Sequence, residues 1–209
     1  MMRKIQIDSK NYIGLRYNHK VRWMNFWHQV REISNLADAP AEVLEIGKGS
    51  GLVSKYLRKM GYVVTTLDID KTVKPDILAS VEDIPTEDGK FDLVLSAEVL
   101  EHLPYEEAPK ALREIRRVTK KSAVISLPYA GSYFKFFLKI PKFPEIDIFI
   151  PIPYFWKKHK VTKEHYWEVG KKGFSVKKIK ALIERAGFEI KKSKVFRDDF
   201  DHIFFVLEK

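Results

Sequence analysis

Short hydrophobic runs alternate with stretches of helical periodicity along most of the chain. The runs at 42–47 and 62–68 contain β-branched residues without polar alternation, as expected for strands covered on both faces. Between them, apolar residues recur at helical spacing until Gly61, which is a typical helix terminator. The order strand, glycine turn, helix, strand predicts a right-handed βαβ unit.

The same alternation extends to the C-terminal residues, where two strands are separated by a short polar turn and should pair antiparallel. We therefore predict an α/β fold: a doubly wound, mostly parallel seven-stranded sheet with a C-terminal antiparallel hairpin, in one domain. The further strands are expected at 76–80, 91–97, 122–128, 188–196 and 201–208, and the further helices at 16–37, 104–120 and 175–187.

Residues 129–174 form an insertion that such a fold does not need. The segment is aromatic, basic and interrupted by prolines, without a clear regular pattern. Long irregular insertions are usually functional lids or binding loops. The chain then divides into an N-terminal helical cap (1–40), an α/β core (41–128), this lid, and a C-terminal helix and hairpin that complete the core (175–209).

Composition excludes several kinds of chemistry. The 209 residues contain no cysteine, which rules out disulfides, thiolate–metal sites and cysteine nucleophiles, and we assign no metal ligand. The first residues lack a signal-peptide pattern, and no run of 18 uncharged apolar residues is present. We expect a cytoplasmic protein without a transmembrane segment.

The net charge of +10 is unevenly distributed. Residues 41–128 carry 15 acidic and 13 basic side chains, whereas the two flanking segments are both basic. This distribution argues against a uniformly basic nucleic-acid surface and leaves room for an anionic substrate held by the flanks.

Three glycines on alternate positions follow the first strand, in the pattern Glu45-x-Gly47-x-Gly49-x-Gly51. A glycine-rich turn there lies at the carboxyl edge of the sheet, where ligands of doubly wound folds bind. A dinucleotide fingerprint would require glycine in place of Leu52, and a phosphate-binding P-loop would require a following Gly-Lys-Ser/Thr. Neither condition is met.

This acid and glycine spacing resembles the first motif of the class I S-adenosylmethionine-dependent methyltransferases, and the resemblance covers about residues 41–128. It implies that Asp68 holds the ribose hydroxyls of S-adenosyl-L-methionine, that Asp83 and Ile84 form the adenine site, and that Ala97 to Val99 flank the methionine and adenine. S-adenosyl-L-homocysteine would be the product. The cofactor-binding residues implied are Glu45, Gly47, Gly49, Gly51, Asp68, Ile69, Asp83, Ile84, Ala97, Glu98 and Val99.

The chemistry of a sulfonium cofactor agrees with these residues. Carboxylates suit its ammonium group and its diol, and apolar side chains suit its purine. An acid inside an apolar strand, such as Glu45, is costly without a partner. Arg16 or Arg22 could close over the cofactor carboxylate, or could belong to a solvated helix face, and Glu101–His102 is expected to be a structural hydrogen-bonding pair.

The insertion is expected to cover the acceptor, because it follows the strand whose end faces the transferred methyl group. His165, Glu164 and His159 are candidate catalytic bases. Aromatic side chains of the insertion either line the acceptor pocket or anchor the segment to the sheet. The candidates for lining are Tyr154, Phe155, Trp156, Tyr166 and Trp167.

We therefore predict methyl transfer by in-line displacement to a small-molecule, sugar or lipid-precursor acceptor, anionic or compatible with aromatic side chains. Methylation of cytosine C5 would need a cysteine, and exocyclic base amines usually need Asn/Asp-Pro-Pro-aromatic after the fourth strand; both features are missing. Three alternatives stay open. They are RNA methylation through the basic flanks, peripheral membrane contact through 133–156, and a non-catalytic cofactor-binding partner protein.

Overall fold

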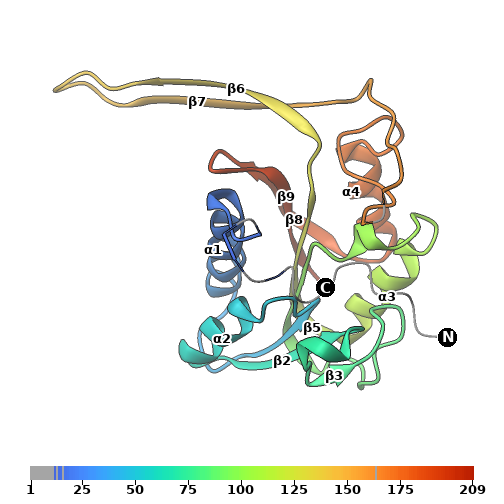
Figure 1. Cartoon of the computed structure of the whole chain (residues 1–209). Coiled ribbons are helices and arrows are strands. Elements are labelled where there is room, and N and C mark those ends of the chain that lie inside the picture. The colour runs from blue at the N-terminus through green and yellow to red at the C-terminus, as the bar shows by residue number, and fades with distance from the viewer. Residues whose placement is uncertain (1–11, 13, 16, 163) are drawn as a thin grey trace.

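A seven-stranded sheet forms the centre of the protein in a computed structural model, which describes residues 12, 14–15, 17–162 and 164–209 (Figure 1). The strand order is β3-β2-β1-β4-β5-β9-β8; the first five strands are parallel, and β9 is antiparallel to both of its neighbours. The predicted fold class is confirmed. The strands are β1 (Glu42–Ile46), β2 (Val63–Asp68), β3 (Ile77–Leu78), β4 (Phe91–Ala97), β5 (Thr119–Pro128), β8 (Glu189–Phe196) and β9 (Asp199–Glu208).

Helices cover both faces of this sheet, so its central strands are buried on both sides. Successive residues of β1 show the consequence: Val43 belongs to one hydrophobic core and Leu44 to the other. The first core lies under α1 and α2, and the second lies under α3 and α4. The helices are α1 (Lys20–Ser34), α2 (Leu52–Lys59), α3 (Ala108–Val118) and α4 (Val176–Arg185).

Two helices are shorter than predicted. The helix expected over 16–37 is α1, which begins at Lys20 because His19 has an extended backbone; Arg16 lies outside the described residues. The helix expected over 104–120 is confined to α3 (Ala108–Val118). It is shorter because residues 105–107 form a turn and Thr119 already belongs to β5.

The prediction that 129–174 lacks regular structure is wrong. Residues Gly131–Leu138 (β6) and Ile146–Pro153 (β7) form a two-stranded antiparallel hairpin separate from the main sheet. Figure 1 shows this hairpin as a long yellow-to-orange arm that projects away from the core. Prolines are tolerated in β7 because each strand of a two-stranded ribbon has one unpaired edge.

The two faces of the hairpin differ in character. On one face, Asp147 forms an ion pair with Arg197, and the ring of Tyr133 lies 4.7 Å from that of Phe200, so this face rests on the β8–β9 turn. Apart from Ser132 at the start of β6, the opposite face carries only hydrophobic side chains, each at least 39% exposed, and we call this set the apolar face. It consists of Phe134, Phe136, Leu138, Ile146, Ile148, Ile150 and Ile152.

Candidate active site

A cavity of about 1230 Å³ opens at the carboxyl ends of the parallel strands. The turns after β1, β2 and β4 form its floor, and side chains of α1, of β9 and of residues 161–162 and 164–166 form its walls. Ligand pockets commonly hold roughly 300–1,000 Å³. The cavity is therefore large enough for a nucleoside cofactor and a second molecule beside it.

The glycine turn needs its glycines for two different reasons. Gly47 has φ +80°, and a Cβ at this position would lie 2.5 Å from Cγ2 of Val99, so any side chain would push into the turn after β4. Gly51 has φ +68° and forms the N-cap of α2. A left-handed backbone costs little only in glycine. Gly47, Gly49 and Gly51 thus let the backbone bend sharply under the cavity.

Asp68 occupies the end of β2 and faces this turn. Its carboxylate accepts hydrogen bonds from the backbone N–H groups of Asp70 (2.9 Å) and Gly49 (3.4 Å). Burial raises the pKa of Asp68, and these backbone N–H groups oppose that effect. Asp68 and the neighbouring Ile69 both line the cavity, as their predicted roles require.

Glu45 also lines the cavity from within β1, although its side chain is almost entirely buried. Burial raises its pKa to about 7, and the Ser54 hydroxyl and the charges of Arg58 and Lys48 only partly offset this. Among the described residues, its Oε2 has no hydrogen-bond partner. A cationic group in the cavity would supply the missing partner and favour the ionised form.

The turn after β4 contributes Ala97, Glu98 and Val99, all of which line the cavity. Glu98 has φ +54°, an uncommon conformation for a residue with a side chain. Its carboxylate accepts a hydrogen bond from Ser126 (3.1 Å) and lies 3.4 Å from Nε2 of His202. Burial alone would lower the pKa of His202, but the charges of Glu98 and Asp199 raise it.

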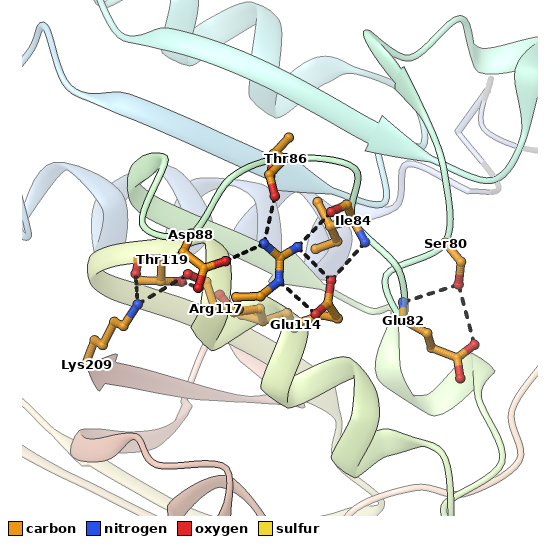
Figure 2. Close-up of polar contacts among 10 residues, drawn as sticks. Ser80, Glu82, Ile84, Thr86, Asp88, Glu114, Arg117, Thr119 and Lys209 are labelled. Atoms are coloured by element: carbon orange, nitrogen blue, oxygen red, sulfur yellow. Dashed lines mark hydrogen bonds and ion pairs between the residues drawn. The ribbon is translucent and has the colours of Figure 1, made fainter.

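The structure does not bring Asp83 and Ile84 to the cavity. Asp83 is exposed, and Ile84 is buried in the core. Figure 2 shows why: the guanidinium of Arg117 donates to the Ile84 carbonyl (2.7 Å), and Glu114 accepts from the Ile84 N–H (3.0 Å), which fixes this loop against α3. The residues that line the cavity at this side are Ala79, Ser80 and Val81.

One end of the cavity gathers a group of ionisable side chains from two distant segments. Glu101 and His102 form part of the short 3-10 helix η3 (Leu100–His102), and Glu164 and His165 come from the insertion. Nδ1 of His165 lies 3.2 Å from the Glu168 carboxylate, which accepts from Lys171 at 2.6 Å. The hydrogen bond from His165 and the Lys171 contact lower the pKa of Glu168 to about 2.

Of the three predicted catalytic residues, two reach the cavity. Glu164 and His165 line it, whereas His159 lies behind them, with Nε2 3.1 Å from the His165 carbonyl and Nδ1 3.3 Å from Nζ of Lys171. The geometry therefore gives His159 a supporting position and leaves it no direct access to a bound acceptor.

The predicted acceptor-lining aromatics are divided in the same way. Tyr166 lines the cavity. Trp167 is fully buried, and its Nε1–H donates to the Leu103 carbonyl at 3.0 Å, so it anchors the segment to the core. Tyr154, Phe155 and Trp156 lie outside the cavity and contact one another at the base of the hairpin.

Sequence reasoning missed several cavity residues near the start of the chain. Tyr12 and Tyr17 line the cavity with their rings 5.2 Å apart, and burial raises the pKa of both. Arg22, weighed only as one of two options, also lines it, with its guanidinium 4.6 Å from the Tyr17 ring. These tyrosines precede α1 outside any recognisable motif, so the sequence carried no signal for them.

The fold and the cavity together define a class I S-adenosylmethionine-dependent methyltransferase fold, as predicted. Residues 44–127 match a family model described as a methyltransferase domain. A ubiquinone biosynthesis O-methyltransferase from Xanthomonas oryzae pv. oryzae is 36% identical over 81 residues, which cover 32% of this chain and 34% of that protein. The matched part thus spans about a third of the length of these curated relatives.

Solved structures extend the similarity to nearly the whole chain. A Burkholderia thailandensis 1,6-didemethyltoxoflavin-N1-methyltransferase, with 1,6-didemethyltoxoflavin and S-adenosylhomocysteine bound, has a TM-score of 0.62 at 14% identity, covering 96% of this chain and 86% of its own. A Mesorhizobium loti S-adenosylmethionine-dependent methyltransferase has a TM-score of 0.61 at 14% identity, and the match covers 94% of this chain and 100% of that one. At these identities the similarity establishes the fold.

Proposed function

We propose that this protein is an S-adenosylmethionine-dependent methyltransferase that acts on an oxygen or nitrogen atom of a small molecule, a sugar or a lipid precursor. The observation that carries the proposal is a cavity with room for two molecules, in which the carboxylates of Glu45 and Asp68 line the cavity beside a glycine turn. The similarity to an O-methyltransferase and to an N-methyltransferase of small molecules supports the acceptor class.

The residues of this chain fit the cofactor's groups. Asp68 would accept from the ribose hydroxyls, and Glu45, whose Oε2 has no partner within the described chain, would accept from the ammonium group. Arg22 would donate to the cofactor's carboxylate from α1. The bound sulfonium supplies an activated methyl group. The protein contributes alignment of the acceptor in line with that group, which can lower a barrier by ~7–11 kcal/mol in well-oriented cases.

His165 is the residue best placed to act on the acceptor. Its ring lines the cavity, and its Nδ1 is oriented by Glu168, so the opposite ring nitrogen is the one offered to a ligand. We propose that His165 assists removal of the acceptor's proton and that Glu164 helps to shape this end of the cavity, whereas His159, which contacts His165 only at its backbone carbonyl, takes no part in the proton transfer.

Two other functions receive less support. RNA methylation would need a basic groove at the cavity, yet the residues that approach it include Glu45, Asp68, Glu98 and Glu101. Binding of unrelated RNA that weakens steeply with added salt would favour this alternative. A non-catalytic cofactor-binding protein would bind S-adenosylmethionine and transfer no methyl group to any acceptor.

The proposal is tested by titrating the protein with S-adenosylmethionine and S-adenosylhomocysteine in a calorimeter, followed by an assay for S-adenosylhomocysteine release with phenols, sugars and prenyl lipids. We expect saturable binding of both compounds and turnover with one acceptor class. His165→Ala should lower turnover about 10²- to 10⁴-fold, as loss of a proton-transfer group does, with cofactor affinity almost unchanged.

The matched control for that variant is His159→Ala, a second histidine of the same segment that lies outside the cavity. It should retain most of the turnover. Absence of cofactor binding by the unmodified protein would refute the proposed function, and equal losses in the two histidine variants would remove His165 from its proposed role.

We also propose that the protein is cytoplasmic and contacts a membrane surface through the hairpin, the second of the open alternatives. Its apolar face is exposed along both strands, and Lys139 and Lys142 lie at its tip. Among the described residues, no helix is long and apolar enough to cross a membrane. A hydrophobic surface flanked by lysines is suited to the interface of an anionic bilayer.

We expect the protein to float with vesicles that contain phosphatidylglycerol and to bind neutral vesicles less. Phe134→Ser, which removes a ring 52% exposed on the apolar face, should reduce flotation several-fold, because the transfer of that ring into the interface is lost. Tyr56→Ser is the matched control: Tyr56 is 53% exposed on α2. Dimerisation through the apolar face without flotation would contradict the membrane assignment.

A further inference from the structure

Three side chains with metal-binding atoms meet at the acceptor end of the cavity. One ligand atom each from Glu101, His102 and His165 lies within 4.8 Å of the others. The two histidine rings lie with centroids 5.4 Å apart, and all three residues line the cavity. One carboxylate and two imidazoles are a ligand set typical of zinc and of other divalent first-row transition metals.

No contact within the described structure explains why the carboxylate of Glu101 is buried. Its side chain is fully buried, and within the described residues neither carboxylate oxygen has a hydrogen-bond partner. A buried polar group without a partner costs free energy, and a buried carboxylate costs far more unless a proton or a cation neutralises it. The predicted structural hydrogen bond between Glu101 and His102 is therefore not what holds this carboxylate.

The two histidines are oriented as metal ligands usually are. Nδ1 of His102 lies 2.5 Å from the Glu164 carbonyl, and a carbonyl oxygen only accepts, so Nδ1 carries the proton and Nε2 the lone pair. Nδ1 of His165 points to the Glu168 carboxylate at 3.2 Å, and Lys171 fixes that carboxylate at 2.6 Å. Metal-binding histidines almost always donate their other ring N–H to a carbonyl or carboxylate in this way.

We propose that Glu101, His102 and His165 bind one divalent transition-metal ion, through the carboxylate and the two Nε2 atoms, at the acceptor end of the cavity. Two imidazoles favour Zn²⁺, Mn²⁺ or Fe²⁺ over Ca²⁺, which prefers oxygen ligands. Three protein ligands leave coordination positions open toward the cavity, as in catalytic metal sites.

The metal site would add a step to the proposed function, and its role in the reaction rests on that function. An acceptor hydroxyl that binds at an open position would have its pKa lowered by the cation and would release its proton to solvent. The new carbon–oxygen bond then forms as the carbon–sulfur bond breaks, and the electron pair of the broken bond stays on sulfur. His165 would thus assist loss of the acceptor's proton as a ligand of the cation that lowers the pKa of the acceptor hydroxyl.

Metal binding is measured on the full chain after treatment with EDTA and dialysis, by calorimetric titration with Zn²⁺ and Mn²⁺ and by the visible absorption of Co²⁺. We expect one ion per chain. Glu101→Gln, which keeps the shape and removes the charge, and His165→Ala should each weaken binding about 100-fold and change the Co²⁺ spectrum. Glu168→Gln, which contacts His165 but neither of the other two proposed ligands, should weaken it about 10- to 100-fold.

Glu106→Gln, which removes an exposed carboxylate outside the cavity, is the matched control and should leave metal affinity unchanged. Should Glu101→Gln fail to fold, Glu168→Gln tests the same site without altering the buried carboxylate. Absence of stoichiometric binding, or binding that no variant weakens, would overturn the inference. Calorimetry with S-adenosylmethionine in the presence of EDTA separates the two proposals. Cofactor binding by a protein that binds no metal refutes only the metal site. Metal binding by a protein that binds no cofactor refutes only the proposed methyltransferase function.

Discussion

Asp68→Asn is expected to weaken S-adenosylmethionine binding about 100-fold or more. Hydrogen bonds to a charged group contribute about 1.5–3 kcal/mol each, and Asp68 would accept from two ribose hydroxyls. The asparagine amide would also face an N–H donor in either orientation, because one carboxylate oxygen accepts from Asp70 and the other from Gly49. Calorimetric titration measures the change in affinity.

Asp83→Asn is the matched control for this prediction. The resemblance assigned Asp83 to the adenine site, but the structure leaves it exposed and away from the cavity. Its replacement should change the affinity less than twofold. A loss of affinity in Asp83→Asn as large as that in Asp68→Asn would show that the loop held by Arg117 rearranges when the cofactor binds.

The sheet and the glycine turn could be predicted because their physical causes are local. A strand covered on both faces must be largely apolar, as Val43, Leu44 and Ile46 are, and a turn with positive φ and no room for Cβ must use glycine, as Gly47 does. An acid at the end of the second strand must then face that turn. These constraints act between residues close in sequence or in one βαβ unit, so the pattern alone expresses them.

The hairpin was missed for a local reason, whereas the acceptor end could not be predicted because it depends on contacts between distant segments. The sequence of β7 alternates isoleucine with aspartate, phenylalanine and proline, and its prolines suggested irregular structure. Glu101 and His165 meet only because the Tyr166 N–H donates to the Glu101 carbonyl (2.9 Å) and Trp167 bonds to Leu103. Nothing in either segment alone indicates this pairing.

Trp167 illustrates how an aromatic side chain can be assigned the wrong neighbours from sequence. Its neighbour Tyr166 reaches the cavity, whereas the Trp167 ring is 0% exposed, edge-on to Tyr105 (5.6 Å) and stacked on Phe174 (6.1 Å). Trp167→Ala should therefore lower the free energy of unfolding by about 3–5 kcal/mol, the usual cost of emptying a buried aromatic position. Urea denaturation followed by circular dichroism measures it.

Two further variants distinguish a core anchor from a residue that lines the acceptor pocket. Trp167→Phe keeps most of the ring but leaves the buried Leu103 carbonyl without its donor, and we expect a smaller loss of about 1–3 kcal/mol. Trp156→Ala changes a ring that is 54% exposed and should alter stability by less than about 0.5 kcal/mol. Because Trp167 carries the segment that positions His165, its loss should also lower turnover by displacing that segment. A Trp167→Ala protein of unchanged stability but weakened acceptor binding would instead show that Trp167 lines the acceptor pocket.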